Sequence, residues 1–123
     1  MTHTSLLELR HQAGEARRGL RWQEAIDLYT EALKEAGGEG DRAHMELDLR
    51  DARAECYRAQ GDCAAELADL RAVVTLADRL GEPDRVVSAL CRIETAAVLS
   101  GRMDEGMAAA EEGLARSRQL GDH

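Results

Sequence analysis

The side chains with chemical reactivity are few and scattered along the sequence. The three cysteines, Cys56, Cys63 and Cys91, include no CxxC pair. The four histidines are His3, His11, His44 and His123. No histidine or cysteine has the spacing of metal ligands, and no nucleophile has a base at a spacing that helices would bring together. We therefore expect no enzyme, no metal site and no cofactor.

The cysteines and the N-terminal segment bear on the compartment. An odd number of cysteines favours small, buried or half-buried apolar side chains in a reducing cytoplasm, with a redox or catalytic thiol as the alternative. The first residues, MTHTSLLELRHQAGEARRG, contain no apolar stretch long enough for a signal peptide or a membrane-spanning helix. We expect a cytoplasmic protein.

Composition and charge favour one fold class and exclude some classes of partner. A net charge of −8 disfavours nucleic acid and anionic membranes, because both require concentrated lysine and arginine. The chain has no phenylalanine, one proline and many alanine, leucine, glutamate and arginine residues, which favours helices over strands. The expected fold class is all-α.

Apolar residues recur at the helical period in six segments that end at glycines. Ser5 and Glu8 form a capping-box pattern before the first segment, and Pro83 suits the first turn of the fifth. Gly61 and Gly101 predict tight turns between antiparallel helices of one pair. Gly81 and the GGEG stretch at 37–40 predict looser turns between pairs; GGEG has neither the strand nor the spacing of a phosphate loop.

The sequence repeats itself. RAQGDCAAELADLRAVVTLA and VLSGRMDEGMAAAEEGLARS align with an offset of forty residues, and RGLRWQEAIDLYTEALKEA aligns with the first at forty-one. Such a period in helix-turn-helix units is typical of a solenoid, in which each pair buries its faces against its neighbours. We expect a single domain over 1–123, with repeats at about 5–40, 41–81 and 83–121. A second expectation is that these repeats are a fragment of a longer array, cut at a repeat boundary.

The segment WQEAIDLYTEAL resembles the second helix of a tetratricopeptide repeat, with Trp22, Ala25, Tyr29 and Ala32 in the positions of that family's motif. Further matches are Ala13 in the first unit, Ala54, Tyr57, Gly61-Asp62 and Leu70 in the second, and Gly101, Met103, Gly106 and Gly113 in the third. The resemblance implies a right-handed solenoid of three antiparallel helix pairs. Repeats near forty residues are similar to the longer variant in bacterial signalling and regulatory proteins.

Two residues depart from the family pattern. Glu66 and Glu94 stand where the family has small residues. A buried carboxylate there requires an arginine partner or a raised pKa. We expect both side chains to lean outward or to pair with arginine.

In such solenoids the first helices of the pairs line a concave groove. The repeat register places these residues there: Arg10, Gly14, Arg17, Asp48, Asp51, Glu55, Arg58, Ser88, Cys91, Arg92 and Thr95. The groove should be basic at its ends and acidic in its middle. The carboxylate clamp of some family members is incomplete, since Gly14, Ala52 and Ser88 occupy three of its positions. Simple solvation of an exposed face is the alternative.

These features give three functional hypotheses. The first is a protein–protein interaction module that binds a peptide or partner domain on the concave face through Arg10, Arg17, Asp51, Glu55, Arg58 and Arg92. The second is a self-assembly or regulatory segment of a larger bacterial signalling protein. A small-molecule-binding helical domain is the third, although few aromatic residues are present to line a pocket.

The last helix pair predicts an oligomer contact. A solenoid needs terminal caps with a polar outer face, and this pair has none. We expect the following residues to be left where the next repeat would stack: Ile93, Ala96, Met107, Ala110 and Leu114. An apolar patch of this kind usually marks an interface, so the prediction is a homodimer through the C-terminal pair.

Overall fold

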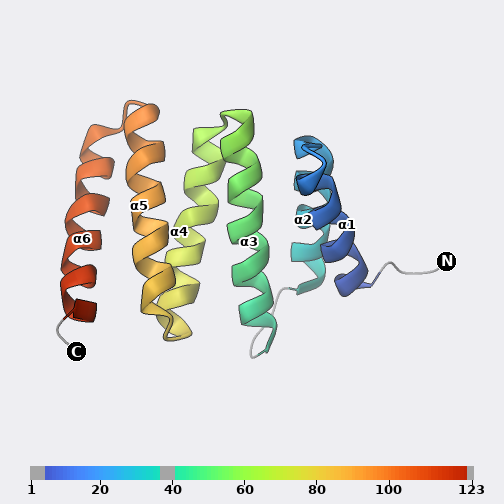
Figure 1. The fold of residues 1–123 in the computed structure, drawn as a ribbon, viewed down its shortest axis with the longest axis horizontal. Coiled ribbons are helices and arrows are strands. Elements are labelled where there is room, and N and C mark those ends of the chain that lie inside the picture. Colours follow the sequence, from blue (N-terminus) through green and yellow to red (C-terminus); the bar gives the residue numbers. More distant parts are fainter. Residues whose placement is uncertain (1–4, 37–40, 122–123) are drawn as a thin grey trace.

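The computed structural model describes residues 5–36 and 41–121, which form helices joined by short turns (Figure 1). The helices are α1 (Leu6–Arg18), α2 (Trp22–Ala36), α3 (Asp41–Gln60), α4 (Cys63–Arg79), α5 (Pro83–Leu99) and α6 (Met103–Gly121). No strand occurs in these two ranges, so the all-α prediction is confirmed. The predicted turn at 37–40 lies outside the described residues.

Polar side chains fix where the helices begin. Ser5 caps α1, its Oγ accepting a hydrogen bond from the Glu8 backbone N–H at 3.2 Å. Asp62 caps α4 in the same way, accepting from the Ala65 N–H at 3.1 Å. Pro83 is the first residue of α5, where its missing N–H leaves no hydrogen bond unmade.

Three turns share one left-handed glycine geometry. Gly61, Gly81 and Gly101 have φ angles of 79°, 70° and 79°, which side chains disfavour. The residue after each glycine donates its N–H back to a carbonyl five residues earlier, at 2.7–3.0 Å, which closes the end of the helix. The sequence predicted a looser turn at Gly81; it has the same geometry as the other two.

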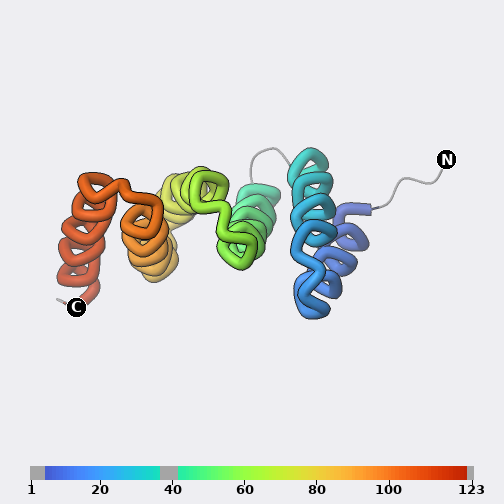
Figure 2. The backbone as a smooth tube through the Cα atoms, turned by 90° about the horizontal axis from the view of Figure 1, so that it is seen from above, coloured from blue at the N-terminus to red at the C-terminus, as the bar shows by residue number. Residues whose placement is uncertain are grey.

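The helices follow one another in a row, and each packs mainly against the helices before and after it in the chain (Figure 1). Viewed from above, α3 and α5 lie on one side of the row and α4 on the other (Figure 2). None of the helices described in the structure combines the length and the hydrophobicity needed to cross a membrane.

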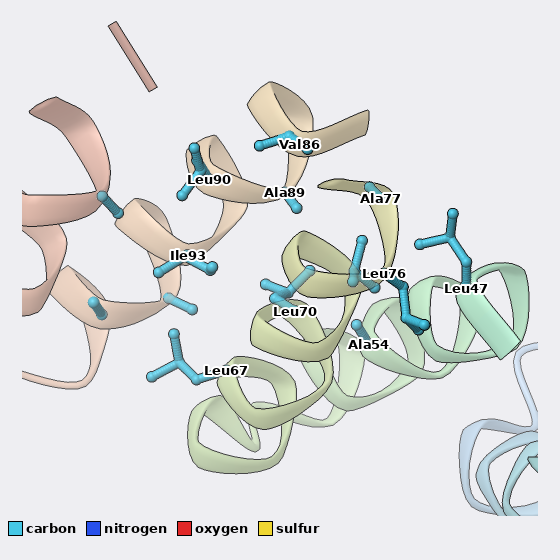
Figure 3. Close-up of a cluster of buried hydrophobic side chains, with 14 residues drawn as sticks. Leu47, Ala54, Leu67, Leu70, Leu76, Ala77, Val86, Ala89, Leu90 and Ile93 are labelled. Carbon is cyan, nitrogen blue, oxygen red and sulfur yellow. The ribbon is translucent and has the colours of Figure 1, made fainter. Parts of the chain in front are cut away.

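Two apolar clusters hold the row together, and α3 belongs to both. Leu49 and Cys56 face the cluster with α1 and α2, whereas Leu47 and Ala54 face the cluster with α4, α5 and α6. Figure 3 shows the second cluster, with Leu70 among its labelled side chains. Since α3 is apolar on two sides, it joins the first helix pair to the rest of the molecule.

Small residues line the contact between α1 and α2. Ala13, Ala16, Ala25 and Ala32 are all 0% exposed and lie in the same cluster. Helices approach closely only where side chains are small. Ala13, Ala25 and Ala32, which match the family motif, thus lie fully buried in the cluster that α1 and α2 share with α3.

Burial overturns two sequence expectations. Glu66 is 3% exposed and makes no hydrogen bond or ion pair with any described residue. The expectation that its side chain leans outward or pairs with arginine is therefore wrong. Glu94 is exposed, as predicted. Ile93 and Ala96 were expected on an open outer face, yet they are 5% and 2% exposed. Both lie in the core between α4, α5 and α6, because α5 already has a helix on each side.

Candidate functional site

Three adjoining cavities lie along the side of the molecule formed by α1, α3 and α5. The first, of about 510 Å³, is lined mainly by α1 and α3, and the second, of about 630 Å³, by α3 and α5. A third of about 210 Å³ reaches down to α4. The first two share Asp51 and Glu55, and the last two share Arg58 and Arg92, so the cavities form one continuous depression, called here the groove.

The groove walls contain the residues that the repeat register placed there. All six predicted partner-binding residues line it: Arg10, Arg17, Asp51, Glu55, Arg58 and Arg92. Side chains on the same face of parallel helices necessarily share one side of the row. The positions agree with the prediction, and their binding of a partner stays a prediction.

Ion pairs cross the groove from α1 to α3. Arg17 donates through Nη1 to Glu55 Oε2 at 2.8 Å. Arg10 lies 4.0 Å from the Asp48 carboxylate and also donates to the Met45 sulfur at 3.5 Å. Long arginine side chains thus span the distance between two helices whose backbones pack against other neighbours.

A second set of ion pairs connects α3 to α5. Arg85 donates to Asp48 at 2.7 Å and to Asp51 at 3.1 Å. Burial lowers the pKa of Arg85, but the hydrogen bonds to these two carboxylates outweigh it, so the pKa is raised overall. Arg92 donates to the Asp51 carboxylate and, at 3.3 Å, to the Asp51 backbone carbonyl.

These contacts change the expected charge pattern. The sequence predicted separate basic ends and an acidic middle, but arginines from both ends reach the central acids and neutralise them. The charged residues that line the groove are Arg10, Arg17, Arg18, Arg58, Arg85, Arg92, Asp48, Asp51, Glu55 and Glu66. Six arginines against four acids leave an excess of two positive charges, in a chain whose net charge is −8.

Two groove arginines take no part in these ion pairs. Neither Arg18 nor Arg58 forms an ion pair with any residue in the described part of the chain, and both are exposed. They belong to the last turns of α1 and α3 and are separated by forty residues, one repeat length. They are the groove arginines that make no ion pair within the described residues.

The smallest cavity contains the buried carboxyl of Glu66. Burial raises the pKa of this group, and the positive charges of Arg92 and Arg58 only partly oppose the effect. Cys63 and Cys91 line the same cavity, one half-buried and the other exposed, and both are free thiols. The third cysteine, Cys56, is fully buried, and burial raises its thiol pKa to about 11, which makes that thiol unreactive.

A buried ion network behind the groove was not predicted. Asp69 on α4 is 1% exposed and accepts from Arg53 Nε at 2.8 Å and Nη2 at 2.6 Å. Arg53 also donates to Thr30 Oγ1 at 3.0 Å, and its guanidinium lies 5.6 Å from the centre of the Tyr57 ring. One arginine of α3 therefore holds α2 and α4 in place.

Sequence reasoning missed Arg18 and Arg85 as groove residues. The signal was present: Arg85 lies seven residues before Arg92, and Arg18 lies four after Gly14, on the same helix faces. Asp69 had a signal too, because it lies four residues before Val73 and seven before Leu76, on an apolar face of α4. Within residues 5–36 and 41–121, no cluster of histidine, cysteine and acidic side chains is suited to hold a metal ion.

No protein-family model matches the sequence, and no curated protein is significantly similar to it.

Proposed function

We propose that the chain is a protein–protein interaction module: a tetratricopeptide-like, right-handed solenoid of three helix pairs that binds a segment of a partner protein in the groove. It acts by binding, without catalysis. The observation that carries the proposal is the continuous groove along α1, α3 and α5, with its two unpaired arginines.

The spacing of the cross-helix contacts supports the repeat architecture. Arg17 and Glu55 are 38 residues apart, and Asp51 and Arg92 are 41 apart. On the opposite side, α4 and α6 are joined by Asp78 and Arg116, again 38 apart. Each pair connects similar positions of consecutive units, which is the pattern expected when repeats of about forty residues stack.

The charges of the groove indicate an acidic partner segment. Arg18 and Arg58 lie at the same ends of two successive first helices, so an extended chain along the groove passes both. An arginine has five N–H donors, and the groove arginines that pair with Asp48, Asp51 and Glu55 keep donors for a second carboxylate. The internal ion pairs hold these side chains in position before binding, which lowers the entropy cost of recognition.

Fluorescence anisotropy tests this proposal with two labelled peptides, one of alternating glutamate and serine and one of alternating lysine and serine. The glutamate peptide should bind, and its affinity should fall as salt is added. Replacing Arg18 and Arg58 together with alanine should weaken that binding about tenfold, at the upper end of what two exposed charge pairs contribute. Binding of the lysine peptide should not be detected.

Arg79→Ala is the matched control. Arg79 is an exposed arginine in the last turn of α4, outside the groove, and forms no ion pair with the described residues. This variant should bind the glutamate peptide as the unmodified protein does. Equal affinity of the Arg18/Arg58 double variant and the unmodified protein, or failure of the glutamate peptide to bind, would refute the acidic-segment proposal.

One observation favours the second candidate function, a self-assembly or regulatory segment of a larger bacterial signalling protein. It is the exposed apolar face of α6, where Met107 is 59% exposed and Leu114 is 58% exposed.

A further inference from the structure

An apolar stripe runs along the exposed face of α6. Met103, Met107 and Leu114 are 55%, 59% and 58% exposed, and the half-buried Ala110 lies between them in sequence. Residues spaced by three, four and seven share one helix face. We call these four residues the α6 stripe.

Two other faces of α6 pack against the rest of the molecule. Gly106 and Gly113 are buried against α5: a Cβ at Gly106 would lie 3.0 Å from Val98, and one at Gly113 would lie 3.7 Å from Leu90. On a further side, Glu105 pairs with Arg71 of α4, and Arg116 pairs with Asp78 of α4 at 2.6 Å. The α6 stripe turns away from these contacts: its two methionines and its leucine are more than half exposed, and only its edge at Ala110 and Leu114 adjoins α5.

Charges flank the α6 stripe along one side. Asp104, Glu111 and Arg118 are seven residues apart in turn, so they lie above one another on the helix, and all three are exposed. Unlike Glu105, Glu112 and Arg116, they form no ion pair with any residue the structure describes. The row has one acid near the start of α6, one acid at its middle and one base near its end.

We infer that the α6 stripe binds the α6 stripe of a second copy of this chain, with the two helices antiparallel about a two-fold axis. Such an interface is self-complementary, because each patch meets the same patch in reverse. In this arrangement Met107 of each copy lies opposite Leu114 of the other. Asp104 of one copy and Arg118 of the other are then offset by a single residue, which is about 1.5 Å along the helix axis. The two-fold axis makes this acid–base contact twice, and it brings the two Glu111 side chains near each other.

The geometry also sets the strength of the contact. A helix of 19 residues is about 28 Å long, so two paired helices bury an area at the lower end of specific interfaces. The dimer should accordingly form in the micromolar range or weaker. The groove is lined by the first helices and not by α6, so this inference goes beyond the proposed function: a dimer has two open grooves and gains avidity for a partner with two acidic segments.

Sedimentation equilibrium at protein concentrations between about 1 µM and 1 mM tests whether the chain dimerises through the α6 stripe. The unmodified protein should shift from monomer to dimer over this range, whereas Met107→Glu should stay monomeric. Leu20→Glu is the matched control, because Leu20 is an exposed leucine, 67% accessible, in the turn between α1 and α2. It should dimerise normally, and far-UV circular dichroism should show all variants folded.

A charge exchange tests the antiparallel register. Asp104→Arg and Arg118→Asp should each raise the dimer dissociation constant about tenfold, since each replaces two attractions with repulsions. Combined in one chain, the two changes should restore the original value. Glu111→Gln should tighten the dimer, because it removes repulsion at the axis.

A protein that is monomeric at the highest concentration, a dimer that survives Met107→Glu, or a charge exchange that does not restore affinity would each overturn the inference. None of these results depends on the groove, which the peptide assay with the Arg18/Arg58 variant tests separately.

Discussion

Two aspartates of α4 make similar contacts with arginine in opposite surroundings. Asp69 accepts from Arg53 at 2.8 and 2.6 Å and from Arg50 at 3.3 Å, and its side chain is 2% exposed. Asp78 accepts from Arg116 at 2.6 and 3.0 Å, but its side chain is 42% exposed. The same substitution, aspartate to asparagine, at the two positions therefore separates the effect of burial from that of hydrogen bonding.

The expected losses differ severalfold. Asparagine keeps the size of aspartate but loses its charge, and its amide N–H₂ points a donor at a donor. At Asp69 the change leaves Arg53, whose side chain is only 15% exposed, without its anion. Removing one partner of a buried pair typically costs 3–5 kcal/mol, and the remaining bond from Arg53 to Thr30 places our expectation near the lower limit, about 3 kcal/mol. At Asp78 solvent screens the charges, so the cost should not exceed about 1 kcal/mol.

Urea unfolding followed by far-UV circular dichroism measures both free energies. A loss of about 3 kcal/mol is a large part of the 5–15 kcal/mol that stabilises a typical domain, so the midpoint for Asp69→Asn should fall clearly. Replacing Asp69 with leucine and Arg53 with methionine together should cost less than Asp69→Asn alone, because no buried charge is then left unpaired. Equal losses at Asp69 and Asp78, or a loss at Asp69 below about 1 kcal/mol, would refute this account of the network.

Two further predictions concern the packing of α1 on α2 and the buried carboxyl of α4. Ala25→Leu should lower stability by about 1–3 kcal/mol, because Ala25 is 0% exposed and has no room for a larger side chain; an unchanged melting temperature would contradict the proposed helix contact. Burial raises the pKa of Glu66 in the folded state above its ordinary 4.5. The protonated carboxyl therefore contributes fully to the stability of the folded protein below pH 4.5, and this contribution is lost as the pH rises through the raised pKa. Glu66→Gln should thus be more stable than the unmodified protein near pH 7 and lose this advantage in acid, as measured by urea unfolding at several pH values; an advantage that does not change with pH would exclude the carboxyl as its cause.

The sequence alone determined the helices, the tight turns at Gly61 and Gly101, and the side on which the groove lies. Periodic apolar residues and left-handed glycines act within a few residues of each other, so Gly61 and Gly101 predict their turns without knowledge of the rest of the chain. The repeat register then places Arg10, Arg17 and Arg92 on one side of the row, since residues at equivalent positions of successive units face the same way.

Only the tertiary structure decided which charges are paired and which apolar residues are covered. An arginine side chain reaches several acids on neighbouring helices, and the choice of Asp51 for Arg92, or of Asp69 for Arg53, depends on how far apart the helices lie and how each is rotated. The same holds for Ile93, predicted to be exposed but buried between α4 and α6, and for Glu66, enclosed by the helices around it. Helical periodicity fixes the angle between residues on one helix, whereas burial is set by the neighbouring helices that cover each face.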